Sequence, residues 1–597
     1  MRPCRVAAFA FVALWLAAPG VASAGEPKAR VEGVSDRALR LEIERAVGAE
    51  KTRPATRLDA RRRAREAAAT VIAVLRSEGF YDYVVAPRVG EGATPEPVVQ
   101  VTPGPRSTIA APRLVWDGRA PDPETQAAAA EAMDLRVGAP GRAADVLAAE
   151  GRIVAVARKR GYADAIVDPR QVIVDHEVRA VEPTFHVAAG DLVRLDGLQV
   201  VARHGRTRAA WIASLATWKQ GAIYDPRKIA ELERRLRDVG IFDSVTVALA
   251  PADKAVGGLR PVIVSLADRP PHTVELGAGY DTSQGAGADA TWINYNLLHR
   301  ADTLTLTARL AQIQQKLDLD LALPDWRRGD QTLKLGGDIF ADQTPAYNDR
   351  GAELRADVVR HYTRTTFITI GGAVDAEDTF EKDAVNANAI PVGRDLKLAI
   401  LSGLGDFALD RSDNPLDPTR GWRLEARLEP AFLTGDRTLG YLKTTVQASG
   451  YLPLEANAST VLAGRLKLGS ILGGKIPDVP ADRRFFSGGG GSVRGYPYQG
   501  VGPTLSDGTP IGGDSLFEVS GEVRQHLAGP WGVAAFVDAG AVGPTLVPDL
   551  RQVDIGAGVG LRYDLGFGPV RIDLATPLDR HRRDPIVQIY LSIGQSF

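Results

Sequence analysis

The feature that most constrains the fold is an alternation of apolar and polar residues that runs from His272 to the end of the chain. It is clearest in residues 304–310 (LTLTARL) and 317–323 (LDLDLAL), where one face is apolar and the other is polar or charged. A packed soluble core excludes repeated charges, whereas the water-filled lumen of a membrane barrel accepts them. No stretch after residue 24 has the roughly 20 consecutive apolar residues that a membrane-spanning helix needs. The pattern therefore predicts a transmembrane β-barrel.

The expected barrel occupies residues 270–597. At roughly 20 residues for each strand and its turn, this length accommodates about sixteen antiparallel strands. The chain ends in an alternating run, 587–597, whose last residue is Phe597. Aromatic residues near the expected strand ends would form girdles at the membrane interfaces, and they are Trp292, Trp326, Trp422, Tyr451 and Tyr563.

Residues 1–24 have the features of a secretory signal peptide. Two arginines precede an apolar run at 6–18, and residues 22–24 (ASA) form a small-residue cleavage site. The only cysteine, Cys4, lies within this segment. We therefore expect an exported mature protein without thiols, disulfides or thiolate metal sites.

Charge and motif content argue against several classes of function. The 72 basic and 73 acidic residues balance, so no global positive field would recruit nucleic acid. The eight histidines are scattered, and the sequence has no metalloprotease helix, hydrolase elbow or phosphate-binding loop. We expect no catalytic residue, no cofactor, no metal site and no nucleic-acid partner.

The first part of the chain contains a repeat with a period of about 80 residues. A helical pattern ends three times in a glycine, at Gly79, Gly161 and Gly240, and a short β-rich run follows each one. Glycine at this position adopts the positive φ that ends a helix. Around the third copy, a strand at 193–198 and the segments after it predict the order β-α-α-β-β. The expected α/β modules cover residues 28–105, 106–186 and 187–268.

A module of this shape has a sheet edge that can pair with an extended segment of another chain. Such pairing uses main-chain hydrogen bonds and places little demand on sequence. We therefore expect the modules to handle clients or to bind a partner.

The densest motif of the barrel half is residues 484–496 (RFFSGGGGSVRGY). Its glycines permit a tightly folded loop, and Arg494 would need an anionic partner if the loop folds inward. Downstream, the alternation of neighbouring residues points Glu522 and Asp538 into the lumen.

Three such modules ahead of a barrel with this loop resemble the outer-membrane assembly superfamily, whose modules are called POTRA. The resemblance covers the chain after residue 24. It implies a sixteen-stranded barrel in the outer membrane, POTRA modules in the periplasm, and an inward-folded loop whose arginine pairs with Asp538, with Glu522 close by. The residues that it places at the contact between loop and barrel wall are Val493, Arg494, Gly495, Tyr496, Glu522 and Asp538.

The resemblance also suggests a mechanism at the seam between the first and last strands. In lipid an open strand edge leaves backbone groups unsatisfied at several kcal/mol each, so a client strand that pairs there is favoured. We expect a factor that helps insert or export client proteins such as autotransporters. The expected seam residues are Val274, Leu276, Val587, Ile589, Leu591, Ile593 and Phe597.

Within the superfamily, three modules resemble the translocation and assembly module family, TamA. That resemblance implies a TamB-like partner anchored in the inner membrane, unfolded outer-membrane proteins as clients, and contact with the lipid bilayer. A two-partner-secretion transporter or a passive pore stays open as the alternative. Such a transporter would have two modules and a long lumen-plugging N-terminal helix, and the sequence predicts neither.

Overall fold

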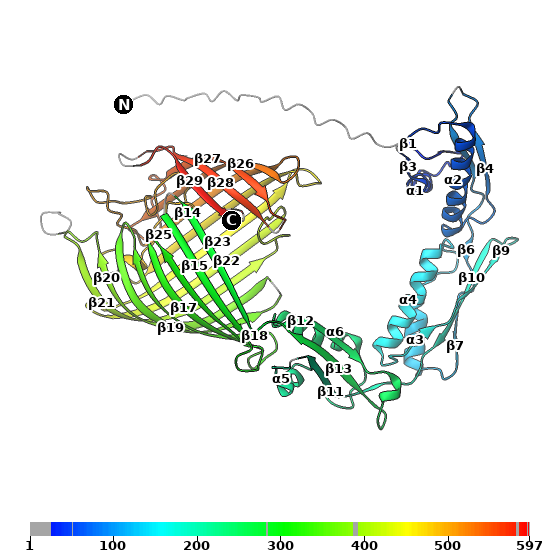
Figure 1. The fold of residues 1–597 in the computed structure, drawn as a ribbon, viewed down its shortest axis with the longest axis horizontal. Helices are drawn as coiled ribbons and strands as arrows, with labels where there is room; N and C mark the ends of the chain where they lie inside the picture. Colours follow the sequence, from blue (N-terminus) through cyan, green and yellow to red (C-terminus); the bar gives the residue numbers. More distant parts are fainter. Residues whose placement is uncertain are drawn as a thin grey trace. The chain divides into compact units, whose positions relative to one another are not determined.

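The computed structural model describes residues 26–597, apart from residues 51, 93, 204, 282–284, 364, 386–391, 567, 581–583, 594 and 596. The expected signal peptide at 1–24 and Cys4 lie outside the described residues. The chain forms two compact units, and the third α/β module contributes segments to both. Figure 1 shows the modules, coloured blue to green, and the large sheet that follows them in the sequence.

The first module packs two helices against a three-stranded sheet. In this sheet β5 lies in the middle, parallel to β2 and antiparallel to β4. Asp36 and Thr56 accept hydrogen bonds from N–H groups in the first turns of α1 and α2, which fixes where these helices begin. Ile43, Val71 and Val99 are fully buried in the core. The elements are β1 (Glu26–Pro27), β2 (Arg30–Glu32), α1 (Arg37–Val47), β3 (Ala49–Glu50), α2 (Arg57–Ser77), β4 (Val84–Val89) and β5 (Pro97–Thr102).

The second module has the same layering around a longer central strand. β10 pairs in parallel with β6 and β7 and antiparallel with β8 and β9. Ile153 of α4 and Phe185 of β10 are fully buried in its core. The elements are β6 (Thr108–Ile109), β7 (Arg113–Trp116), α3 (Pro123–Met133), α4 (Ala143–Lys159), β8 (Ile166–Val167), β9 (Gln171–Asp175) and β10 (Ala180–Ala188).

The third module has the predicted β-α-α-β-β order, with the sheet order β11-β13-β12. Its first strand extends to Arg203, beyond the 193–198 segment that the sequence pattern indicated. The elements are β11 (Arg194–Arg203), α5 (Ala209–Ser214), α6 (Pro226–Asp238), β12 (Phe242–Leu249), η1 (Ala252–Lys254) and β13 (Leu259–Asp268).

The three repeated glycines end helices and also hold the chain that leaves each module. All three have positive φ, between 71° and 107°. The carbonyl of Gly79 accepts the Ser107 N–H at 2.8 Å, and that of Gly161 accepts the Val193 N–H at 2.9 Å. In the third copy, the carbonyl of Gly240 accepts the Arg269 guanidinium at 2.9 Å. One turn thus serves both as a helix end and as a junction.

The second half of the chain is a sixteen-stranded antiparallel sheet curled into a barrel (Figure 1). Each strand pairs with its neighbours in sequence from β14 to β29, in agreement with the number expected from length. Among the residues that the structure describes, no helix is long and apolar enough to cross a membrane. The strands are β14 (His272–Asp281), β15 (Gly285–Tyr295), β16 (Thr303–Ala311), β17 (Gln314–Pro324), β18 (Gln331–Gln343), β19 (Tyr347–His361), β20 (Thr366–Glu381), β21 (Arg394–Asp410), β22 (Gly421–Gly435), β23 (Leu439–Pro453), β24 (Thr460–Leu472), β25 (Ser515–His526), β26 (Trp531–Gly543), β27 (Asp554–Asp564), β28 (Pro569–Pro577) and β29 (Gln588–Ile593).

The alternation in sequence becomes an apolar outer face and a charged inner face. On β19, Leu354 is 72 % exposed. The next residue, Arg355, lies on the other face, where its guanidinium bonds Asp318 at 2.7 Å, Asp320 at 2.6 Å and Asp338 at 2.8 Å. Charges therefore gather in the lumen, as a barrel in lipid requires.

An ion pair within the first unit joins Asp164, which follows Gly161, to Arg260. The guanidinium donates to both carboxylate oxygens, at 2.6 and 2.9 Å. These hydrogen bonds hold the pKa of Asp164 below its ordinary value. The pair therefore contributes stability above the ordinary aspartate pKa of about 4, and this contribution is lost as pH falls through the lowered value.

We expect Asp164→Asn to loosen this junction at neutral pH and to remove its sensitivity to acid. Hydrogen exchange of the Val193 amide in the full-length protein measures this. In the wild type, protection should be high at neutral pH and fall below about pH 4, because the carboxylate is then protonated. In Asp164→Asn it should be low throughout. Glu150→Gln, which removes a surface pair with Arg170, is the control and should leave this amide unchanged. Equal protection in Asp164→Asn and wild type at neutral pH would contradict the assignment.

Candidate functional site

The segment that joins β24 to β25, residues 473–514, is folded into the barrel and is called the inner loop. It contains the glycine-rich motif singled out in the sequence and the short helix η2 (Ala481–Arg483). Val493 and Tyr496 are fully buried, and Arg494 is 2 % exposed. A loop with this burial is held by the barrel wall.

Arg494 is the centre of that contact. Its Nε and Nη2 donate to the two carboxylate oxygens of Asp538 on β26, at 2.7 and 3.0 Å. Its Nη1 donates to Glu522 on β25 at 3.0 Å and to Asp573 on β28 at 3.1 Å. The guanidinium also lies over the ring of Phe536, 3.3 Å from the ring centroid. A bidentate, charge-assisted pair of this kind fixes position as well as charge.

Two of the three carboxylates that receive Arg494, those of Glu522 and Asp573, also pair with further arginines of the wall. Glu522 accepts Arg524 Nε at 2.9 Å and pairs with Arg562 at 3.3 Å. Asp573 accepts Arg562 as well and lies 3.8 Å from Arg571. All of these side chains are buried. Positive and negative charges are thus interleaved, and removing one member leaves a buried charge without compensation.

The glycine and tyrosine of the motif explain why the loop can approach so closely. Gly495 has φ +104°, and a Cβ there would lie 2.7 Å from the carbonyl carbon of Thr576. Its N–H donates to the Tyr590 hydroxyl at 3.1 Å. The Tyr496 hydroxyl donates to the carbonyl of Asp579 at 3.0 Å. The motif therefore seats the loop against β28 and β29.

The structure brings together all six residues that the resemblance placed at this contact. Sequence analysis did not identify Asp573, Arg562 or Arg524 as members of the network. The alternation of residues in β28 indicates that Asp573 faces the lumen. Alternation does not tell which lumen residues contact one another.

Two further arginines hold the inner loop, and sequence analysis did not identify either contact. Arg484 pairs with Glu381 at 3.1 Å and with Asp383 at 2.6 Å. Arg465 of β24 donates to the carbonyl oxygens of Gly491 and Ser492, at 3.0 and 3.1 Å, next to Arg494. Among the described residues, one group of carboxylates has the spacing of metal ligands, and it comprises Asp349, Glu377 and Asp482.

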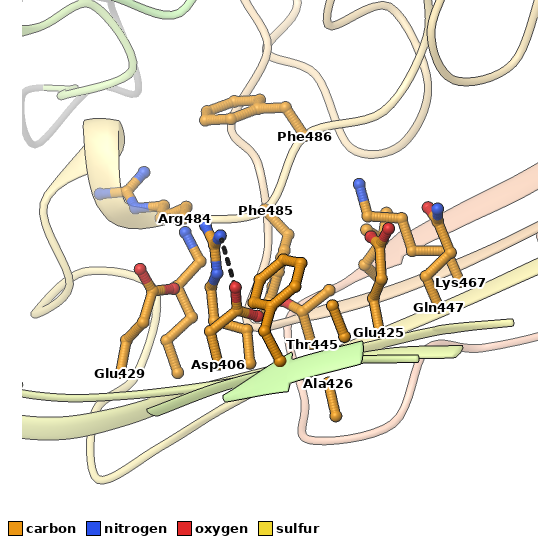
Figure 2. A pocket seen from close by; sticks show the side chains of 15 residues that line it. Asp406, Glu425, Ala426, Glu429, Thr445, Gln447, Lys467, Arg484, Phe485 and Phe486 are labelled. Atoms are coloured by element: carbon orange, nitrogen blue, oxygen red, sulfur yellow. Dashed lines mark ion pairs between the residues drawn. The ribbon is translucent and has the colours of Figure 1, made fainter. Parts of the chain in front are cut away.

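A polar cavity of about 630 Å³ lies between residues 484–486 of the inner loop and the barrel wall. Figure 2 shows Asp406, Glu425 and Lys467 directed from the barrel strands towards the loop that carries Phe485 and Phe486. The dashed line marks the ion pair of Asp406 with Arg427, 3.7 Å apart. The lining carries both signs of charge, as expected of a lumen that holds water.

The seam residues lie on two strands with different environments. Val274 and Leu276 of β14 are 65 % and 80 % exposed, and Ile589 and Leu591 of β29 are 47 % and 50 % exposed. β29 pairs with β28 from Gln588 to Ile593, and β14 pairs with β15 from His272 to Asp281. Val587 precedes β29, and the side chain of Ile593 lies outside the description.

Phe597 is not at the seam, contrary to the expectation from sequence. β29 ends at Ile593, and the Gln595 N–H donates to the carbonyl of Leu416 at 3.1 Å. Phe597 packs on Tyr451 and its neighbours on β24, and its carbonyl accepts Arg524 at 3.3 Å. The tail therefore leaves the strand and enters the lumen, because arginines there stabilise it.

Comparison with known proteins identifies the family. The sequence profile of the Omp85 superfamily domain matches residues 296–597, just over half of the chain. The chain belongs to the Omp85 superfamily. As an Omp85 protein with POTRA modules, it lies in the outer membrane with these modules in the periplasm.

Among curated relatives, the outer membrane protein assembly factors BamA of Neorickettsia risticii and Neisseria meningitidis are 22 % and 24 % identical to this Omp85 chain. The alignments cover 70 % and 73 % of this chain and 57 % and 60 % of the relatives. The chain thus matches less than two thirds of their length. Both names are those of assembly factors and neither is that of an enzyme or of TamA.

The crystal structure of BamA from Haemophilus ducreyi lacking POTRA domains 1–3 is similar, with a TM-score of 0.66 at 19 % identity. The match covers 82 % of this chain and 99 % of that one. The two share the fold of an Omp85 barrel preceded by POTRA modules.

We expect Arg494→Ala to lower the free energy of unfolding by about 3–5 kcal/mol, because it leaves Asp538, Glu522 and Asp573 short of one buried cation. Arg494→Lys keeps the charge but loses the bidentate geometry, so its effect should be intermediate. Urea unfolding of the full-length protein in detergent measures both. Arg551→Ala, which removes an exposed loop pair, is the control. Arg494→Ala as stable as Arg551→Ala would show that the network does not hold the loop.

Proposed function

We propose that this Omp85 protein helps other polypeptides to insert into or cross the outer membrane, with the edge strands β14 and β29 as the place where a client strand pairs. The observation that carries the proposal is the unequal length of the two terminal strands of the sheet order, since β14 has ten residues and β29 has six. Unpaired backbone groups in lipid cost several kcal/mol each, so a client strand that supplies hydrogen bonds there is strongly favoured.

The shape of the last strand supports this proposal. β29 has six residues and β14 has ten, so a closed ladder along the whole of β14 would exceed the length of β29. The chain after Ile593 turns inward to Leu416 and Asp417, where Gln595 donates to the Asp417 carboxylate at 2.8 Å. The unmatched part of β14 then offers N–H and C=O groups to an extended client.

The modules supply a second kind of pairing surface. In the first module β4 is an edge strand, and Val84 at its start is 65 % exposed. An extended segment can add to such an edge through main-chain hydrogen bonds. In this proposal the modules, bounded at 28–105, 106–186 and 187–268, bind a partner and guide clients in the periplasm.

The finer assignment within the proposal is a TamA-type role. The three modules support this role. In it, autotransporters are the clients, and a TamB-like protein anchored in the inner membrane is the partner. The BamA relatives support the general role in assembly, since they are named outer membrane protein assembly factors.

We expect a disulfide across the seam, made from Leu276→Cys and Ile589→Cys, to block client assembly, because it prevents a client strand from entering between β14 and β29. Assembly of an autotransporter in cells, compared with and without reductant, measures this. The control is a disulfide between Leu354→Cys and Val374→Cys, which are directly opposite on the paired strands β19 and β20. That pair should leave assembly intact.

If the seam disulfide forms in full yield and assembly proceeds at the unlocked rate, the seam is not the pairing site. The barrel would then act as a secretion channel or passive pore. A loss of client assembly in the disulfide-locked protein supports the proposal only if reductant restores assembly.

We expect a photo-crosslinker at Val84 to capture the TamB-like partner, because it lies on the open edge of the first module. Leu58 on α2 is the control, since it is 76 % exposed but lies on a helix away from the sheet edge. Crosslinking in cells followed by identification of the adduct measures the difference. Equal capture at both positions, or capture at neither, would argue against partner binding at this edge.

A further inference from the structure

Three carboxylates from distant parts of the chain meet where the inner loop approaches β19 and β20. Asp349 lies near the start of β19, Glu377 near the end of β20, and Asp482 in η2 of the inner loop. One oxygen from each lies within 4.8 Å of the others. Asp349 and Glu377 are 6 % and 5 % exposed, and the Asp482 side chain is 6 % exposed. The cluster is at the end of the barrel opposite the one where β14 begins.

The cluster carries more negative charge than its neighbours balance. A fourth carboxylate, Asp375, joins it through Arg483, whose Nη2 lies 3.3 Å from Asp375 and also contacts Glu377. The second nearby cation, Lys443, donates to the carbonyl of Arg483 at 3.0 Å rather than to a carboxylate. Arg483 Nε also pairs with Asp482 at 2.6 Å, so three of the carboxylates share one guanidinium, and a further acid, Asp342, lies opposite Asp349 on β18.

Buried oxygens without partners give independent evidence that something else binds here. Glu377 Oε1, Asp375 Oδ1 and Asp482 Oδ1 are buried and accept no hydrogen bond from any described residue. Buried polar atoms are nearly always satisfied, and a carboxylate oxygen left bare costs more than a neutral one. The Arg494 network differs, because both oxygens of Asp538, Glu522 and Asp573 accept hydrogen bonds from arginines. The bare oxygens of the acidic cluster need a cation.

We propose that Asp349, Glu377 and Asp482 bind one calcium ion that clasps the inner loop to the barrel wall. Calcium takes six to eight oxygen ligands at about 2.3–2.6 Å in irregular geometry, so ligand oxygens lie up to about 5 Å apart. The oxygens of this cluster, all within 4.8 Å of one another, lie inside that range, and calcium accepts the irregular arrangement that two strands and a loop provide more readily than magnesium, which needs a nearly regular octahedron. The double charge of the ion suits a cluster in which carboxylates outnumber the cations that contact them.

The calcium site and Arg494 hold different ends of the inner loop. Arg494 fixes its second half to β25, β26 and β28, and the calcium ion fixes its first half, through Asp482, to β19 and β20. The two contacts are chemically distinct, because chelation of calcium removes the contact through Asp482 and leaves the Arg494 network in place. Calcium therefore adds to the Arg484 pairs with Glu381 and Asp383 in holding the residues around η2 against the wall.

The test uses the full-length protein in detergent, treated with EGTA and then titrated with calcium chloride alone. We expect one calcium ion per chain by equilibrium dialysis, a rise in Tm on calcium addition, and slower hydrogen exchange in residues 481–484. Asp482→Asn and Glu377→Gln keep side-chain size and should each weaken binding at least tenfold. Asp406→Asn removes a lumen carboxylate outside the cluster and should bind as the wild type does.

Three results would overturn the proposal. The first is a wild-type protein with no calcium-dependent change in Tm or exchange. The second is an equal response to magnesium and calcium at the same concentration. The third is a Glu377→Gln protein that is more stable than the EGTA-treated wild type, when calcium changes the stability of neither. That result would mean that protons neutralise the cluster. None of these readouts depends on client assembly, so the site stands or falls separately from the proposed function.

Discussion

In hydrocarbon, a backbone N–H or C=O group without a partner costs several kcal/mol, and the second half of this chain is organised by that constraint. Every strand between β14 and β29 meets it by pairing with both neighbours in sequence. A sheet built in this way has only two edges, so topology alone decides where another polypeptide could exchange hydrogen bonds with it. The inward turn after Ile593 adds to this effect, because it withdraws the end of the chain from the edge that it would otherwise lengthen.

The surrounding hydrocarbon also confines charged side chains to the lumen, and these side chains hold the inner loop. With apolar residues committed to the outer face, the lumen holds arginines and carboxylates that must satisfy one another. Around Arg494 they do so within the protein. Around Arg483 they do not, since three buried oxygens have no partner among the described residues. One loop is therefore held in two ways, by a self-sufficient network and by a group of acids that favours an added cation.

Much of this was predictable, because alternation depends only on neighbours in sequence. Period-two patterning predicted the barrel and the inward direction of Glu522 and Asp538, and length predicted the number of strands. The repeated glycines predicted three modules. Residues such as Asp573 and Glu381 were missed, since their partners lie about 80 to 100 positions away on other strands and parity does not specify which lumen residues meet. Phe597 was misplaced for a related reason: the alternating pattern continues past Ile593, while attraction to Arg465 and Arg524 turns the tail inward.

The glycine turns that end the module helices have a consequence for how such a chain can evolve. At Gly79 and Gly161 the same turn closes one helix and fastens the segment that leads onward. Each connector thus joins a glycine carbonyl of one module to a backbone N–H near the start of the next, and a bond between main-chain groups does not depend on the side chain at either position. Duplicating or deleting one unit would leave such an acceptor and such a donor on either side of the change. A gene of this design can gain or lose reach in whole steps, by recombination between repeats, with the same main-chain hydrogen bond at the new join.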